Sequence, residues 1–195
     1  MAWTPDLPPV QCASADEVAV LQRQLERDVL CVPTSSMGRL FDAVSSLLGV
    51  RHLATYEAQA AVELEWIAAS HMDDARDYRF DASGGDVDPA PVLGALIDDL
   101  RHRCPTGPMA AGFHVAVAHL IAEQAELLHQ ETGIARVALS GGVFQNVLLL
   151  RLARTALRAR GLSVLTHRVV PPNDGGLALG QAAVGGGADH AWAGA

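Results

Sequence analysis

The chain has 195 residues, half of them apolar and 18% charged, which is enough for one ordinary globular domain with a hydrophobic core. Acidic residues outnumber basic ones by 22 to 14, and the net charge of −8 disfavours binding to a nucleic-acid backbone. All the basic residues are arginine. The absence of lysine excludes Schiff-base catalysis, pyridoxal phosphate anchoring and a Walker-A lysine, because each needs a primary amine.

The first two thirds of the sequence are predicted to be helical. Residues 1–11 carry three prolines and are expected to form an extended arm. A short strand is predicted at 78–81, followed by a turn at 83–86, and prolines break the chain at 105–108. Apolar periodicity predicts helices at 17–30, about 37–48, 57–70, 89–103 and 109–131. The second of these would be capped by Thr34, Ser35 or Ser36 and would end before Gly49.

The last third changes to strand, glycine turn and helix. Strands at 136–140 and 162–166 flank an amphipathic helix at 146–160, which predicts a right-handed unit with parallel strands. A small-residue helix at 177–184 follows, and the glycines after it predict a frayed end. The fold class is therefore α/β, helix-rich with a small mixed sheet that contains a parallel βαβ unit.

The segment Ser140-Gly141-Gly142 is the best candidate site. It joins the carboxyl end of a parallel strand to a helix N-terminus, where open α/β sheets place their ligands. The two glycine amides and the helix dipole would hold phosphate oxygens without a lysine. A tight turn without any ligand fits the same residues. The segment is neither a GxGxxG motif nor a pyrophosphatase-type loop, because Val143 follows instead of an acidic residue.

Two polar residues belong near this turn. Asn146 could contact a base, a ribose or a metal-bound water, or could be an ordinary helix-terminal asparagine. Asp174 follows the neighbouring strand and should emerge at the same edge, where a hard metal ion could bridge it to a phosphate. Capping of the helix that follows is the alternative role for Asp174.

Other charged residues have simpler interpretations when each is taken alone. Asp42 falls on an amphipathic helix and suits its polar side, and Glu57 opens a helix whose dipole it would complement. His114 and His119 are five residues apart, about 140° around one helix, which is too divergent for a shared metal ion. We interpret both as structural or surface histidines. Cys12, Cys31 and Cys104 are odd in number and widely spaced, so neither a disulfide framework nor a zinc ribbon is expected.

Four segments together resemble the C-terminal part of the HypF family, the carbamoyltransferases of NiFe-hydrogenase maturation. They are Pro33–Asp42, Tyr56–Ala61, Ser140–Asn146 and Pro171–Gly180, and they match in order and spacing over about residues 31–185. The resemblance implies the actin/Hsp70/sugar-kinase (ASKHA) fold, with this chain as its C-terminal lobe. Residues 1–30 are then an arm and helix, 31–185 the lobe, and 186–195 a flexible tail.

The resemblance also implies a function and a set of site residues. In the HypF family an upstream domain makes carbamoyl adenylate from carbamoyl phosphate and ATP, and this domain passes the carbamoyl group to the C-terminal cysteine of HypE. Asp42 resembles the ribose-binding acid, Asn146 a nucleotide-contacting residue and Asp174 a metal ligand. The remaining nucleotide-binding positions implied are Glu57 and Gln59 on the adenosine side, and Ser140, Gly141 and Gly142 on the phosphate loop.

The sequence departs from the family pattern in three ways. Ala58 replaces the usual glycine, the HxxxH pair of metal-binding histidines is missing, and the upstream domains are absent. We therefore expect a fragment, a split subunit or a remnant, without turnover on its own. A divalent ion (Fe, Zn or Mg) is expected only in the complete domain.

Expected partners are HypE and the missing domains, or a second copy of the chain. Nucleic acid is not an expected partner, because the net charge is −8. A membrane is not expected either, because no signal peptide and no apolar run of about 18 residues is found, and the predicted location is the cytoplasm. Two alternatives stay open: an O-carbamoyltransferase of antibiotic biosynthesis, and a non-catalytic docking or oligomerisation module.

Overall fold

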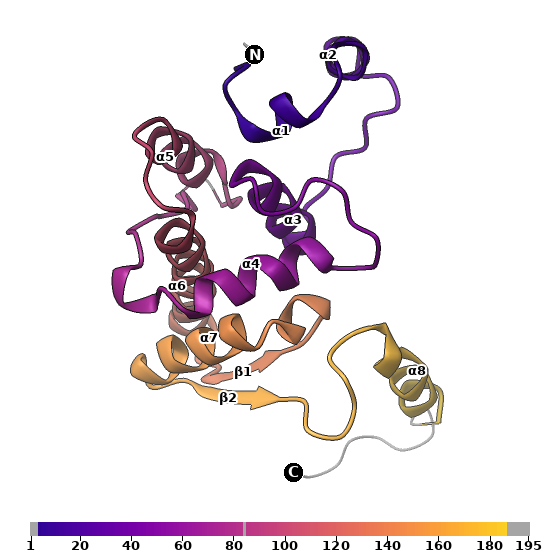
Figure 1. The fold of residues 1–195 in the computed structure, drawn as a ribbon. Coiled ribbons are helices and arrows are strands. Elements are labelled where there is room, and N and C mark those ends of the chain that lie inside the picture. Colours follow the sequence, from indigo (N-terminus) through magenta and orange to yellow (C-terminus); the bar gives the residue numbers. More distant parts are fainter. Residues whose placement is uncertain (1–3, 84, 187–195) are drawn as a thin grey trace. The chain divides into compact units, whose positions relative to one another are not determined.

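The computed structural model describes residues 4–83 and 85–186 and is mainly helical (Figure 1). The chain forms two compact units, and the boundary between them lies between Leu120 and Ile121, inside α6. The domain boundaries predicted at 30 and 185 stay predictions. The helices are α1 (Pro8–Cys12), α2 (Ala15–Arg27), α3 (Met37–Leu47), α4 (Gln59–Ala69), α5 (Ala90–Arg101), α6 (Thr106–Thr132), α7 (Val147–Ala159) and α8 (Leu177–Gly186), and the strands are β1 (Arg136–Leu139) and β2 (Ser163–Thr166).

The N-terminal segment is more helical than predicted. The extended arm predicted at 1–11 is wrong for residues 8–11, which belong to α1, while residues 1–3 lie outside the described part. Pro8 begins α1, where a missing N–H costs no helical hydrogen bond. The next helix is confirmed as α2, and Ser14 begins it by exchanging hydrogen bonds with Glu17 in a capping box.

The following three helices are confirmed with small shifts. Ser36 is the cap of α3, since its hydroxyl accepts the Arg39 N–H, and Gly49 takes the left-handed conformation just past the helix end at φ +71°. The helix predicted at 57–70 begins only at Gln59, so Glu57 does not open it but lies in the preceding turn. The helix predicted at 89–103 is α5.

Two predictions between α4 and α6 are wrong. The strand at 78–81 is absent, and the only pairing there is a single antiparallel bridge between Asp81 and Asp88, because no neighbouring strand continues the ladder in the described residues. Gly84 of the predicted turn lies outside the described residues. The break expected at 105–108 is confirmed at Pro105, since the chain is not helical between α5 and α6, but it is wrong for 106–108. Pro108 falls in the first turn of α6, where its missing N–H is tolerated.

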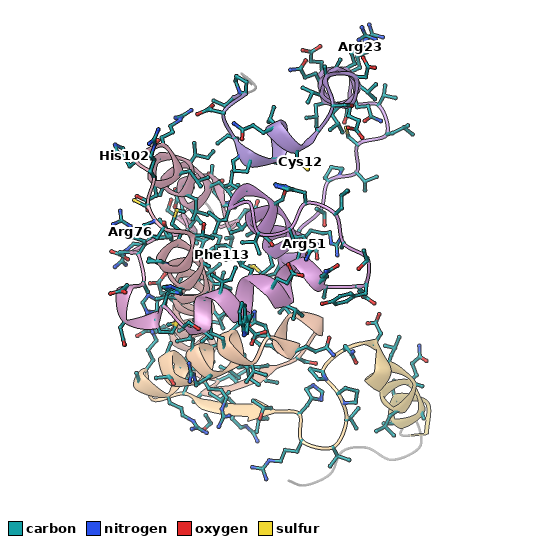
Figure 2. All side chains as sticks on the ribbon, viewed as in Figure 1. Cys12, Arg23, Arg51, Arg76, His102 and Phe113 are labelled. Atoms are coloured by element: carbon teal, nitrogen blue, oxygen red, sulfur yellow. The ribbon has the colours of Figure 1, made fainter. Side chains whose placement is uncertain are left out.

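The core of the first unit is built around aromatic rings on α3 and α6. Phe113 lies on α6 (Figure 2). Phe41 meets Phe113 edge to face, with ring centroids 4.9 Å apart, and meets the His114 ring at 5.1 Å. His114 is fully buried, and its Nδ1 donates to the Ala110 carbonyl oxygen at 2.8 Å. Burial lowers the pKa of His114 to about 4, although the Ala110 hydrogen bond opposes the shift. The structural interpretation is confirmed for His114, and His119 is exposed.

We predict that the first unit loses stability as the pH falls from about 6.5 toward 4. His114 has a lowered pKa in the folded state and an ordinary one near 6.5 in the unfolded state, so its contribution is complete above pH 6.5 and disappears on acidification. The full loss amounts to about 3 kcal/mol. Urea unfolding at pH 7.5 and 4.5 should show a smaller pH dependence for His114→Gln than for the wild type or the exposed control His119→Gln. An equal change in the free energy of unfolding between the two pH values for all three proteins would contradict this role of His114.

A partly buried ion pair between Arg76 and Asp99 attaches the chain before α5 to α5 itself. The Arg76 guanidinium donates to both carboxylate oxygens of Asp99, at 3.0 and 2.7 Å, and the Tyr78 hydroxyl donates to Asp99 at 2.6 Å. Burial opposes ionisation of Asp99, but these hydrogen bonds outweigh it and lower the pKa of its carboxyl. The same segment touches α6, because the Arg76 N–H donates to the Pro108 carbonyl oxygen and a side chain at Gly112 would clash with the Arg76 backbone.

Gly112→Ala should therefore destabilise the protein by about 2 kcal/mol, because the added methyl group must displace backbone instead of a flexible side chain. Gly94 is the matched control. It lies in the interior of α5 with open space around it, so Gly94→Ala should stabilise the protein by up to about 1 kcal/mol through helix propensity. Denaturant titration measures both changes, and a shift of the same sign for the two variants would refute this account of Gly112.

The second unit contains the predicted βαβ arrangement. β1 and β2 pair in parallel, and α7 crosses between them and packs on β2 (Figure 1). Among the described residues the sheet consists of this parallel pair alone. The only antiparallel pairing described is the single bridge between Asp81 and Asp88 in the first unit. α8 continues to Gly186, two residues beyond the prediction. The rest of the predicted tail, from 187, is outside the described residues.

Candidate functional site

The carboxyl ends of β1 and β2 carry the candidate site. Leu139 pairs with Thr166 in the parallel register, so the next residues, Ser140 and His167, leave the two strands at the same level. His167 Nε2 lies 2.8 Å from Ser140 Oγ. The predicted meeting of the two loops at one edge is correct, since the Gly141 N–H also donates to the Pro172 carbonyl oxygen at 2.8 Å.

The two glycines of the first loop have different roles. Gly141 adopts φ +101°, which only glycine adopts readily. Gly142 has open space where a side chain would be, and its amide makes no hydrogen bond to any described residue. The Gly141 amide is already used by Pro172, so Gly142 is the glycine whose amide can meet a ligand. A short 3₁₀ turn, Gly142–Gln145, separates this loop from α7.

Asn146 is the N-terminal cap of α7. Its side-chain oxygen accepts the Leu149 N–H at 2.7 Å, and the residue is 8% exposed. The interpretation as a helix-terminal asparagine is therefore confirmed. A contact between Asn146 and a nucleotide stays a prediction.

Asp174 lies at the start of the second loop's 3₁₀ turn, Asp174–Gly176. Asn173 caps this turn, since its side-chain oxygen accepts the Gly175 N–H at 3.1 Å. Capping of α8 by Asp174 stays a prediction. Asp174 is exposed. No group of three or more histidine, cysteine or acidic side chains suited to a metal ion occurs in residues 4–83 and 85–186. One carboxylate does not hold a divalent ion tightly, so the described residues by themselves do not fit a metal site.

A groove of about 720 Å³ lies along the two loops, which is a volume typical of small-molecule sites. Ser140, Gly141 and His167 line one part of it, and Asn173 and Asp174 another. The sequence analysis did not single out His167. Its position directly after β2, equivalent to that of Ser140 after β1, is the signal that identifies it.

The other predicted nucleotide-binding residues belong to the first unit. Asp42 on α3 pairs with Arg39 at 2.8 Å and keeps 26% of its side chain exposed, as suits the polar side of a helix. Glu57 is exposed in the turn before α4. Roles for both in ribose or adenosine binding stay predictions.

Gln59 is buried and holds the turn before α4 in place. Its side-chain oxygen accepts the Thr55 N–H at 2.8 Å, and its amide nitrogen donates to Glu63 at 2.9 Å. Arg51 binds the same Glu63 carboxylate with two hydrogen bonds, and the hydrogen bonds from Arg51 and Gln59 lower the pKa of Glu63. Gln59 therefore has a structural role here, and its predicted contact with adenosine stays a prediction.

Ala58, where the HypF pattern has glycine, adopts the left-handed conformation at φ +61° and ψ 11°. A Cβ atom in this conformation costs roughly 1 kcal/mol. The physical reason for glycine at this position is thus the backbone conformation that leads into α4.

Ala58→Gly should raise the free energy of unfolding by up to about 0.5 kcal/mol, because the strain that is relieved exceeds the entropy that glycine adds to the unfolded chain. Ala61→Gly, inside α4, is the control and should lower it by about 1 kcal/mol through helix propensity. Thermal or urea unfolding distinguishes the two. Destabilisation by both substitutions would mean that Ala58 is not strained.

The fold and the paired loops define the class of protein: an α/β lobe with a glycine turn at the carboxyl edge of its parallel strands. The family model described as carbamoyltransferase, Kae1-like domain, second subdomain matches residues 3–181. The carbamoyltransferase HypF of Synechocystis sp. is 38% identical over 154 residues, which cover 76% of this chain and 19% of that protein. The HypF of Rhodobacter capsulatus is 39% identical, with 84% and 21% covered.

Solved structures agree with these matches. A full-length HypF crystallised in a phosphate- and nucleotide-bound form aligns over 95% of this chain and 25% of its own, with a TM-score of 0.83 and 35% identity. The HypF of T. kodakarensis aligns with a TM-score of 0.81 and 27% identity, covering 94% and 24%. The chain thus belongs to the HypF carbamoyltransferase family. It spans about a fifth of the length of these two relatives from Synechocystis and Rhodobacter.

Proposed function

We propose that the chain is the nucleotide-binding lobe of a HypF-type carbamoyltransferase, which transfers a carbamoyl group to the C-terminal cysteine of HypE when the other domains are present. The observation that carries the proposal is the groove lined by Ser140, Gly141, Asn173 and Asp174. Gly142 directly follows Gly141 in the first loop, and its amide makes no hydrogen bond to any described residue. The nucleotide-bound HypF of known structure, which is similar over nearly the whole chain, supports it.

The chemistry of the groove suits the phosphates of ATP or carbamoyl adenylate. The Gly142 amide and the Ser140 hydroxyl are neutral donors, and a chain without lysine must bind phosphate oxygens with such groups or with arginine. A divalent ion enters this proposal only in the complete domain, with Asp174 as one ligand among others from outside the chain. We accordingly propose no carbamoyl transfer by the isolated chain.

The proposal predicts saturable binding of ATP to the purified chain, measured by calorimetric titration with and without Mg²⁺. Asn146→Ser is the informative variant, because serine keeps the helix cap and removes the amide. We expect Asn146→Ser to keep wild-type stability and to bind ATP about tenfold more weakly, which corresponds to about 1.4 kcal/mol. Asn146→Ala should lose the affinity and also about 1 kcal/mol of stability.

Other outcomes have definite meanings. Wild-type affinity in both variants would leave Asn146 as a cap only. No ATP binding at millimolar concentration would reject the proposal for the isolated chain. The docking alternative would then be favoured by α2, which has no buried residue and exposes Val20, Leu21 and Leu25.

A further inference from the structure

The strongest feature that the proposed function does not use is the contact between His167 and Ser140. The two side chains come from different loops and are 27 residues apart in the sequence. Register explains their meeting, because each directly follows one member of the Leu139–Thr166 pair. A hydroxyl both donates and accepts, so it can pair with the imidazole Nε2 in either tautomer.

A second hydrogen bond joins the same two loops. The Gly141 N–H donates to the Pro172 carbonyl oxygen at 2.8 Å. The second loop is itself tightly folded, since a Cβ atom at Gly176 would come within 2.7 Å of Val170 and 2.8 Å of Pro171. The first loop is thus attached at Ser140 and Gly141 to a compact support.

The Gly142 N–H belongs to the same peptide as the Gly141 carbonyl oxygen, which accepts the Phe144 N–H at 3.1 Å. Gly141 has the flexible backbone of a glycine in the left-handed region, so this peptide can still rotate with the turn when the residues before it are not held. Anchoring Ser140 restricts that rotation before any ligand arrives. Preorganised donors bind more tightly, because the ligand does not have to order them.

We propose that His167 is a positioning residue, which holds Ser140 and thereby fixes the Gly142 amide for a phosphate group. This inference rests on the proposed function and names a residue that acts through Ser140 instead of through direct contact with the nucleotide. His167 lines the groove, so direct contact is the competing explanation. The two explanations differ in how substitutions at His167 and Ser140 combine.

The test is a double-mutant cycle on ATP affinity, measured by calorimetry with His167→Ala, Ser140→Ala and the double variant. His167→Ala should bind ATP about fivefold more weakly, which is the effect of one hydrogen bond, and Ser140→Ala should lose at least as much affinity. The double variant should be no weaker than Ser140→Ala alone. Ser140→Thr keeps the hydroxyl and should restore the affinity. Val169→Ala is the matched control, since Val169 is 96% exposed in the same loop, and it should bind like the wild type. Additive losses, or no loss for His167→Ala, would overturn the inference.

Amide hydrogen exchange separates this inference from the proposed function. His167→Ala should speed exchange of the Gly141 amide several-fold and leave the Leu149 amide, which Asn146 caps, unchanged. Should the wild type fail to bind ATP, faster Gly141 exchange would still support the positioning role while rejecting nucleotide binding. Unchanged Gly141 exchange would overturn the positioning role whatever the affinity.

Discussion

The parallel pairing of β1 with β2 is the constraint on which the second unit depends. A parallel pair needs a crossover, and α7 supplies it while burying Leu149, Ala153 and Leu157. The pairing brings two loops that are distant in the sequence to one edge. The Arg160–Glu126 ion pair, at 2.9 Å, then ties the end of α7 to the last turns of α6. This small framework fixes the two loops that line one side of the groove, and α8 lines the other side.

The first unit is organised by different interactions. Its core is an aromatic cluster around Phe41 and Phe113, and its long connection between α4 and α5 is held by the carboxylate of Asp99. That connection contains only a 3₁₀ turn at Met72–Asp74 and the Asp81–Asp88 bridge among its described residues, so side-chain hydrogen bonds hold most of it in place. Gly112 permits the close approach of the Arg76 backbone to α6, so a loop without a strand ladder still has a defined position. Among the described residues, no helix in either unit is long and apolar enough to cross a membrane.

The HypF-like motifs carry structural requirements as well as chemistry. Gln59 anchors the turn before α4, Asn146 caps α7, and Gly141 supplies a left-handed residue. Residues of this kind are needed for the local fold whether or not a nucleotide binds. Their presence alone therefore cannot separate a working lobe from a retained scaffold. The Gly142 amide is more informative, because the described fold makes no use of it.

The sequence by itself determined the helices from α2 onward, the βαβ unit and the family, because apolar periodicity, caps and glycine turns are local signals. It also identified the loops at Gly141 and Asp174, since parallel strands place their carboxyl ends together. It did not predict α1, where prolines favoured an extended arm. It mispredicted a strand at 78–81. Apolar and polar residues alternate there, but no partner strand lies beside the segment in the described residues. It also missed His167, which gains its meaning only from the register that sets it beside Ser140. Only the tertiary structure decided such points, because cross-strand partners, close backbone approaches and occupied hydrogen bonds depend on residues far apart in the chain.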